Sequence, residues 1–170
     1  PIESDIYRVN LSDLSKTKIT DRDGPDHSPS VSPDGKTIAF LGYDDELKSY
    51  QQTNLYMMDA DGKDLREVDK DFDRSIESVK WGADSKTAYV IYENSGTHEV
   101  GSVTKRGNVQ TVATNIGGTS IGRPYGSGSF SVSRTSTPSF AYTAGFSDKP
   151  AEVALQTGGD KTILTDLNGD

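Results

Sequence analysis

Ser32-Pro33-Asp34-Gly35-Lys36-Thr37-Ile38-Ala39-Phe40 decides the fold, because a weaker copy of this stretch returns further along the chain. The copy, Trp81-Gly82-Ala83-Asp84-Ser85-Lys86-Thr87-Ala88-Tyr89-Val90, keeps the acidic turn, the Lys-Thr step and the apolar strand. In the first copy proline presets φ, aspartate can bond back to the backbone and glycine can take a positive φ, as a tight turn requires. A tight turn that leads into an alternating strand and recurs after about 40–50 residues is typical of a β-propeller blade.

Short alternating strands separated by Gly, Asn, Asp and Pro fill the rest of the chain, and helical periodicity is weak throughout. Outer hairpins are expected to begin near Ile6, Leu55, Val100 and Val153, a spacing within the propeller range. Because each cycle supplies the four strands of one blade, we predict an all-β, partial propeller of about three full blades plus part of another.

The predicted divisions follow from this cycle. Residues 1–22 are the outer strands of an incomplete blade, residues 23–70, 71–115 and 116–166 are blades, and residues 167–170 start the next connection. Closed propellers contain about four or more blades, so the chain should form an open arc with exposed apolar faces or strand edges at its ends. Such edges leave self-association open. A chain that opens on Pro1 is expected to be a piece of a longer protein.

Composition narrows the function classes. The 170 residues carry a net charge of -8, no cysteine and 32% hydrophobic residues. Without cysteine there is no disulfide or thiolate metal site, and we expect no metal and no cofactor. The cations form no stripe, so nucleic acid is not an expected partner, and no apolar run is long enough to suggest a membrane. The cytoplasm is slightly favoured as the compartment, with the periplasm left open.

Three stretches resemble the propeller of the prolyl oligopeptidase family of serine peptidases, in its acylaminoacyl peptidase and dipeptidyl-peptidase-like branch. They are Gly24-Pro25-Asp26-His27-Ser28-Pro29-Ser30-Val31-Ser32-Pro33-Asp34-Gly35-Lys36, Phe40-Leu41-Gly42-Tyr43-Asp44-Asp45 and the run from Gly117-Gly118-Thr119-Ser120-Ile121-Gly122-Arg123-Pro124-Tyr125 to Ser133. The Ser-Pro-Asp-Gly-Lys element alone is also found in Tol-system propellers, whereas the Gly-Gly run is more specific.

The resemblance implies a role as well as a fold. In such enzymes the propeller caps an α/β-hydrolase domain that carries the catalytic Ser-Asp-His, and it restricts access so that peptides are cleaved. The expected partners are therefore that hydrolase domain and a peptide substrate, and this chain itself is expected to be inactive. The alternative is a stand-alone protein-binding propeller of the Tol-like or sensor type. A glycan-processing propeller is a weaker rival, because it needs a carboxylate pair across a pocket.

The Gly-rich run contains one literal motif match and two candidate contact residues. Gly118-Thr119-Ser120-Ile121-Gly122 matches the nucleophile elbow, but that elbow needs a following helix, and here Arg123-Pro124-Tyr125-Gly126 follows instead. We therefore expect no catalytic residue in this chain and interpret the segment as a loop. Arg123 and Tyr125 could hold a peptide carboxylate or contact the hydrolase domain, with packing against a neighbouring blade as the alternative.

Acidic turns supply the other candidates. Asp44 and Asp45 follow an inner strand and could meet a substrate amine, with a solvated loop as the alternative. The Asp59–Asp64 turn lacks the further ligands of a calcium loop and is read as a hairpin. We expect Asp69, Asp71 and Asp73 to lie in a solvated outer loop. His27 has no second ligand nearby in the sequence, so it is not expected to bind a metal.

Overall fold

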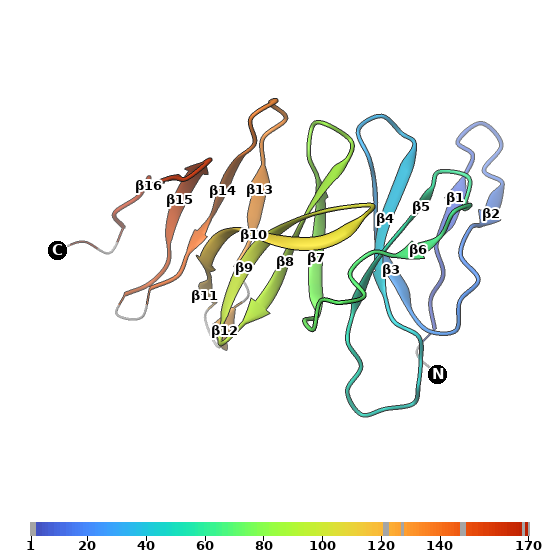
Figure 1. Ribbon diagram of the computed structural model, residues 1–170, viewed down its shortest axis with the longest axis horizontal. Coiled ribbons are helices and arrows are strands. Elements are labelled where there is room, and N and C mark those ends of the chain that lie inside the picture. Colours follow the sequence, from blue (N-terminus) through green and yellow to red (C-terminus); the bar gives the residue numbers. More distant parts are fainter. Residues whose placement is uncertain (1–2, 121–122, 127, 147–148, 168, 170) are drawn as a thin grey trace.

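The computed structural model of the chain describes residues 3–120, 123–126, 128–146, 149–167 and 169, with the backbone alone for 119–120 and 123–126. Among these residues there is no helix, and therefore none that could cross a membrane. The strands are antiparallel and lie side by side along a curved row (Figure 1). This confirms the predicted all-β, open partial propeller.

Three blades and a half-blade make up the row. The half-blade is the hairpin of β1 (Tyr7–Val9) and β2 (Lys16–Lys18). Blade A is a four-stranded sheet and is followed by blades B and C. Blade A contains β3 (Asp26–Val31), β4 (Thr37–Gly42), β5 (Asn54–Asp59) and β6 (Arg66–Glu67); blade B contains β7 (Ile76–Trp81), β8 (Thr87–Asn94), β9 (Thr97–Thr104) and β10 (Gly107–Ile116); blade C contains β13 (Phe130–Val132), β14 (Ser139–Ala144), β15 (Glu152–Thr157) and β16 (Asp160–Ile163).

Two further pairings modify this simple row. The pair Ile116↔Ala144 joins β10 to β14, so blades B and C form one eight-stranded sheet. A separate hairpin of β11 (Gly118–Ser120) and β12 (Arg123–Gly126) projects from the connection between them. The segment predicted as a loop is therefore a short hairpin, because its backbone groups pair with each other although its sequence lacks alternation.

The core lies between blades rather than within one sheet. Along β4 the side chains alternate: Ala39 and Leu41 pack toward blade B, whereas Ile38 and Phe40 pack toward the half-blade. Period-2 alternation in a strand that is covered on both faces explains why β4 is buried over its whole length. Burying one such leucine contributes about 1.5–3 kcal/mol, so neighbouring blades stabilise each other mainly through these faces.

The sequence repeat itself forms part of the contact between blades A and B. The Trp81 indole Nε1–H donates to the Ser30 carbonyl at 2.9 Å, and the Asp34 amide donates to the Ser85 hydroxyl at 3.1 Å. Corresponding turns of the two copies therefore touch. Tyr89 lies in the core between blades B and C. Its ring packs edge to face on the ring of Phe140, with 4.9 Å between the two ring centres.

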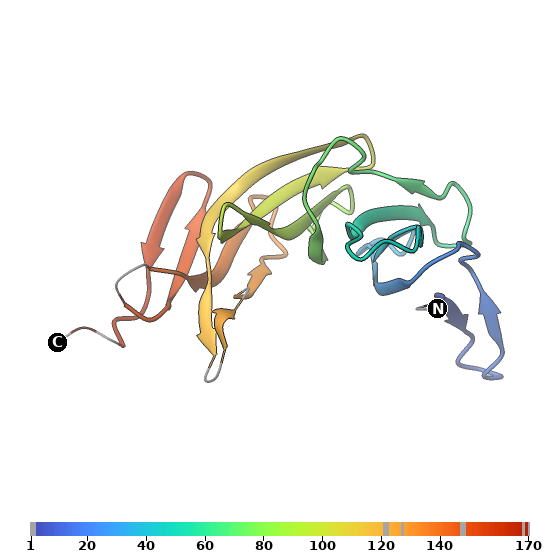
Figure 2. The same ribbon diagram turned by 90° about the horizontal axis from the view of Figure 1, so that it is seen from below.

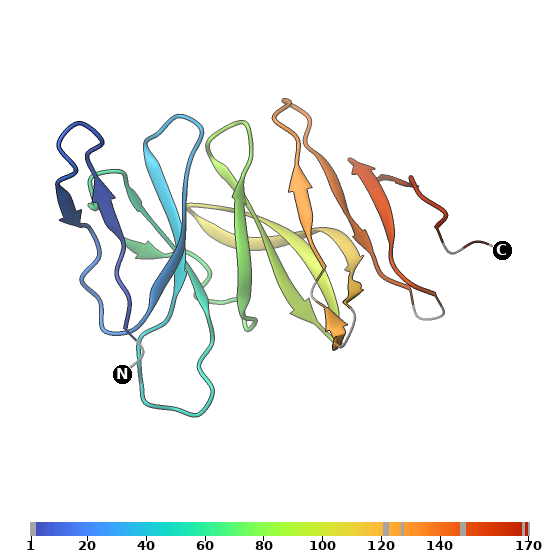
Figure 3. The same cartoon turned by 180° about the vertical axis from the view of Figure 1, so that it is seen from behind.

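The row curves into an arch whose two ends do not meet (Figure 2). The half-blade lies at one end and β15 and β16 lie at the other (Figures 1 and 3). Large apolar side chains are exposed at both ends, including Tyr7 and Val9 on β1 and Val153 and Leu155 on β15. The expected exposure of apolar surface at the ends of the arc is thus present.

Candidate functional sites

Connections gather on two opposite sides of the arc. The tight turns at 32–36, 82–86 and 133–138 lie on one side, and the β4–β5 loop (residues 43–53) and the β11–β12 hairpin lie on the other (Figures 1 and 3). The sequence candidates Asp44, Asp45, Arg123 and Tyr125 therefore fall on the same side of the molecule. Blade B stands between the loop and the hairpin, so the structure does not bring the four residues into one cluster.

The β4–β5 loop is held in shape by its own hydrogen bonds. The Asp45 carboxylate accepts from the Gln51 side-chain amide at 2.9 Å and from the Leu47 backbone N–H at 2.9 Å. These bonds, that from Gln51 foremost, lower the pKa of Asp45. The loop presents Leu47 and Tyr50 to solvent, at 88% and 74% exposure. Asp45 thus organises a protruding loop.

Asp44 belongs to a network around Arg22 that the sequence did not reveal. The Arg22 guanidinium donates to Asp26 Oδ1 at 2.5 Å and to Asp44 Oδ1 at 2.6 Å, and it lies 3.7 Å from the centre of the Tyr56 ring. Asp44 keeps a side-chain exposure of 72%, whereas Asp26 is completely buried. The network ties the β4–β5 loop to the start of blade A and leaves one face of Asp44 open to solvent.

Burial governs the electrostatics of this network. Desolvation raises the pKa of Asp26, against the lowering effect of Thr20 and Arg22. Asp26 Oδ2 has no hydrogen-bond partner among the described residues. Gly42 leaves the room that Asp26 needs, because a Cβ there would lie 2.5 Å from the Pro25 carbonyl and 2.8 Å from Asp26 Oδ1. The resemblance stretch beginning at Gly24 thus builds the junction between the half-blade and blade A.

The β11–β12 hairpin rises from a base of closely packed glycines. Gly117 and Gly128 lie so close together that a Cβ on Gly128 would be 2.9 Å from the Gly117 backbone nitrogen. Gly128 has a φ of +70°, and a Cβ there would lie 2.6 Å from Thr143 Oγ1. The backbone amides of Gly117 and Gly145 donate to Thr143 and Asn115 at 2.9 and 2.8 Å. The glycines therefore allow close backbone approach at the base of the hairpin.

The hairpin carries three residues singled out from the sequence. Ser120 ends β11, and Arg123 and Tyr125 belong to β12, where Ser120 pairs with Arg123. Ile121 and Gly122 of the motif lie outside the described residues. A nucleophile elbow joins a strand to a helix, whereas here the strand before Ser120 leads to a second strand. The G-x-S-x-G match therefore does not lie at a strand-to-helix turn.

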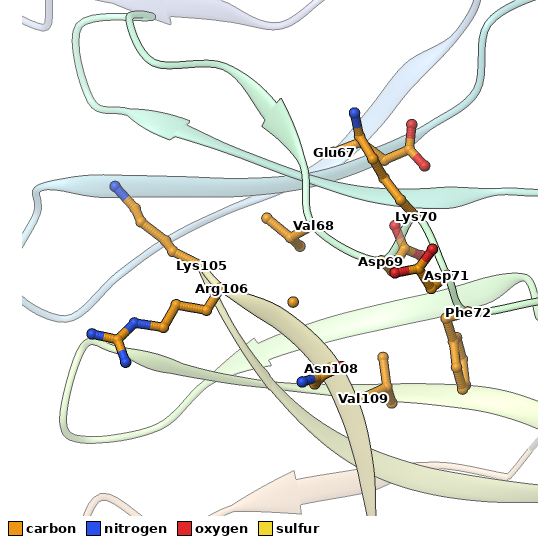
Figure 4. A pocket seen from close by; sticks show the side chains of 11 residues that line it. Glu67, Val68, Asp69, Lys70, Asp71, Phe72, Lys105, Arg106, Asn108 and Val109 are labelled. Carbon is orange, nitrogen blue, oxygen red and sulfur yellow. The ribbon is translucent and has the colours of Figure 1, made fainter.

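A hollow of about 310 Å³ lies at the outer junction of blades A and B. Acidic side chains from the β6–β7 connection line one part of it, and Lys105 and Arg106 from the β9–β10 turn line another (Figure 4). Lys105 also reaches Asp59 Oδ1 at 3.0 Å. The lining combines both signs of charge with Val68, Phe72 and Val109, and it contains no serine or histidine that could serve as nucleophile or base.

Asp69 in this hollow corrects one expectation from the sequence. Its side chain is buried, with 2% exposure, rather than solvated like that of Asp73. Asp69 Oδ1 accepts from the Leu55 backbone N–H at 3.0 Å, and Oδ2 lacks a partner among the described residues. Desolvation raises the pKa of Asp69 to about 7. The alternating acidic run gave no sign of this, because the difference arises from packing against β5.

The histidines lie apart. His27 Nδ1 is 3.0 Å from the neighbouring Ser28 hydroxyl, and His98 Nε2 is 2.9 Å from Glu77 Oε1. In the part of the chain that the structure describes, no group of three or more His, Asp or Glu side chains could hold a metal ion.

The Asp61–Gly62 turn closes the β5–β6 hairpin, as the sequence predicts.

Comparisons with known proteins find partial sequence matches to proteins named dipeptidyl-peptidase 5 and a shared fold with solved propeller structures. No family model matches the chain. The chain is 36% identical to a probable dipeptidyl-peptidase 5 of Arthroderma benhamiae over 78 residues. These matched residues make up 44% of this chain and 10% of that protein. Over 94 residues it is 33% identical to dipeptidyl-peptidase 5 of Porphyromonas gingivalis, which is 52% of this chain and 13% of that protein. The matched segments thus span only about a tenth of the length of these relatives.

Solved structures share the fold at low identity. The chain matches TolB from Acinetobacter baumannii with a TM-score of 0.62 and 21% identity, over 95% of this chain and 37% of that one. It matches the propeller domain of the Trilobed protease from Pyrococcus furiosus with a TM-score of 0.62 and 18% identity, over 96% and 44%. It matches the acylaminoacyl peptidase of Pyrococcus horikoshii with a TM-score of 0.61 and 16% identity, over 94% of this chain and 27% of that one. These three likenesses show the propeller fold. The resemblance seen in the sequence is supported by the relatives named dipeptidyl-peptidase 5.

Proposed function

We propose that the chain is the propeller segment of a serine peptidase and that it gates and orients peptides over a hydrolase domain. The single observation that carries this proposal is the sequence identity of 36% to a dipeptidyl-peptidase 5. The fold supports it, because the Trilobed protease and an acylaminoacyl peptidase carry the same kind of propeller. The chain contributes no nucleophile to the reaction. Its part is to limit which substrates reach the hydrolase and how they lie.

The side of the arc that carries the β4–β5 loop and the β11–β12 hairpin is the proposed contact face. Both elements protrude there (Figure 1), and both are anchored, the loop through Asp45 and Arg22 and the hairpin through its glycine base. Anchored elements lose little conformational freedom when they bind. Asp44 would meet a substrate amine or a cation of the hydrolase domain, and Arg123 and Tyr125 would meet a carboxylate of the hydrolase domain.

The second candidate is a stand-alone binding propeller, which the similarity in fold to TolB favours. The reading frame of the protein that contains this chain distinguishes the two. A downstream G-x-S-x-G followed by Asp and His supports the peptidase proposal. A stop soon after Asp170 would leave the binding module as the better explanation.

Gating is tested in the longer protein that contains this chain. Replacing the β11–β12 segment 119–125 by two glycines should raise kcat/KM for long peptides by about tenfold, because the obstacle is removed. The value for a small chromogenic substrate should stay unchanged, because the catalytic groups are untouched. Shortening the tight turn at 133–138 on the opposite side is the matched control. Equal effects on long and small substrates would contradict the gating role.

A further inference from the structure

The hollow between blades A and B is bounded on both sides by residues that the structure describes. We call it the junction hollow; its walls are residues 67–72, from β6 and the β6–β7 connection, and residues 105–109, from the β9–β10 turn and the start of β10. Its volume of about 310 Å³ lies at the lower end of the range of about 300–1,000 Å³ that is usual for small-molecule sites. The junction hollow is therefore large enough for a small organic ligand.

Contacts within the fold hold the two walls in place. Gly107 has a φ of +83°, and a Cβ there would lie 2.8 Å from the Val68 carbonyl oxygen, so the β9–β10 turn rests directly on the opposite wall. Lys105 Nζ, on the same turn, is 3.0 Å from Asp59 Oδ1 of blade A. Walls that are already fixed lose little conformational freedom when a ligand binds.

One end of the junction hollow offers acceptors that lack a donor. Asp69 is 2% exposed, and its Oδ1 accepts from the Leu55 backbone N–H at 3.0 Å, whereas its Oδ2 has no partner among the described residues. Asp71 lines the same end (Figure 4), is exposed and has no ion-pair partner among the described side chains. A buried carboxylate oxygen without a donor is costly. A ligand ammonium, with its three N–H donors, would supply the missing partner.

The other end of the junction hollow offers an unpaired cation. Figure 4 shows Lys105 and Arg106 on the side opposite the two aspartates. Lys105 is engaged by Asp59, whereas Arg106 is exposed and has no ion-pair partner within the part of the chain that the structure describes. A guanidinium binds a carboxylate through two parallel hydrogen bonds, so Arg106 can receive the negative end of a ligand.

Between the two ends the lining is apolar. Val68 is buried, and Phe72 and Val109 pack against the core shared by blades A and B. The whole lining holds as many acidic as basic side chains, namely Glu67, Asp69 and Asp71 against Lys70, Lys105 and Arg106. A ligand with a single charge therefore gains little net attraction, whereas a ligand with a positive and a negative end gains at both.

We propose that the junction hollow binds a short peptide with free ends, of about the size of a dipeptide. The peptide ammonium donates to Asp69 and Asp71, the peptide carboxylate accepts from Arg106, and an apolar side chain lies on Val68 and Val109. This binding site goes beyond the proposed role over a hydrolase domain and does not depend on it.

Amide NMR spectra of the 170-residue chain, titrated with the dipeptide alanyl-leucine, test the proposal. At about pH 7 both free ends of the dipeptide are charged. We expect saturable shifts at Val68, Asp71, Gly107 and Val109 and none in blade C. N-acetyl-alanyl-leucine, which lacks the ammonium, and alanyl-leucine amide, which lacks the carboxylate, should each bind at least about tenfold more weakly.

Substitutions at the two ends separate the two charges. Asp69→Asn and Arg106→Gln should each weaken the binding of alanyl-leucine at least about tenfold. Asp73→Asn, at a 98% exposed side chain, and Arg134→Gln, at an exposed position in the 133–138 turn, are the matched controls outside the hollow and should bind like the parent chain. Arg106→Gln should also bind alanyl-leucine and its amide equally, because the carboxylate has lost its partner. Asp71→Asn, at an exposed position, replaces Asp69→Asn if the melting temperature of the latter shows a loss of fold.

Two results overturn the proposal. The absence of a saturable shift at the hollow residues shows that the junction hollow takes no short peptide. Equal binding of the free dipeptide and of both blocked forms shows an apolar contact that does not read the charged ends. Neither result bears on the peptidase proposal, whose readouts are the reading frame and substrate selectivity.

Discussion

Asp69 is the residue whose protonation should most affect the stability of the fold. Its carboxyl is buried and its pKa is raised from 3.8 to about 7. The folded chain therefore binds this proton more tightly than the unfolded chain. The contribution of the protonated Asp69 carboxyl to the free energy of unfolding is fully present below about pH 4. It is lost as the pH rises through about 7. At one unit of pKa for about 1.4 kcal/mol, the loss is on the order of 2–4 kcal/mol.

The variant Asp69→Asn tests this, because an amide stays neutral and can still accept from the Leu55 N–H. We expect the free energy of unfolding, measured in urea between pH 5 and pH 8, to lose most of its decline with pH. A smaller decline should remain, because the pKa of Asp26 is also raised. Asp73→Asn, at a 98% exposed side chain, is the control and should keep the slope of the parent chain. An unchanged slope in Asp69→Asn would show that Asp69 does not titrate in this range.

Replacing Arg22 should lower the free energy of unfolding far more than replacing its exposed partner Asp44. Arg22→Met leaves the buried Asp26 carboxylate without its cation, and breaking a buried pair in this way costs about 3–5 kcal/mol. Asp44→Asn removes only the exposed partner and should cost less than about 1 kcal/mol. Urea midpoints of the two variants provide the comparison. Similar losses in both would mean that the guanidinium stabilises the β4–β5 loop rather than Asp26.

At the scale of the element, a glycine fixes the junction of β4 with the start of blade A. Gly42→Ala would place a Cβ 2.5 Å from the Pro25 carbonyl, and such overpacking costs about 1–3 kcal/mol. Gly159→Ala is the matched control, because a Cβ there meets nothing within 4 Å, and it should be neutral. Thermal unfolding of both variants gives the difference. Equal melting temperatures would show that β3 and β4 can move apart without loss.

Strands were predicted best where the local pattern and the packing of the blades act in the same direction. The apolar strand expected after the Ser32–Lys36 turn is β4, and the outer hairpin expected to begin near Leu55 begins with β5. The β11–β12 hairpin was missed because its glycines and its proline indicate a loop. The contacts at its base, such as that between Gly128 and Thr143, join residues that are far apart in the chain, and the local sequence pattern does not show them.

The sequence could identify some residues of the candidate sites but not others, depending on whether their partners lie nearby in the chain. The sequence could nominate Asp44 and Asp45 because they follow an inner strand, and both prove to hold the β4–β5 loop. Arg22 and Asp69 could not be found, because their roles come from partners on other strands, Asp26 and Tyr56 for the first and Leu55 for the second. The functions proposed for Arg123 and Tyr125 stay predictions.

At the scale of the whole molecule, each blade is stabilised only by its neighbours, as in other repeat proteins. The blades in the middle of the row have two partners, and the half-blade and blade C have one each. Local opening should therefore cost least at the ends of the arch and most in blades A and B.

Hydrogen exchange followed by mass spectrometry should show this gradient directly. We expect amides of β4, β5, β8 and β9 to exchange most slowly and those of β1, β2 and β16 fastest, by a factor of about a hundred or more. Uniform protection along the chain would contradict the nearest-neighbour account, since it would require the whole arch to open as one unit.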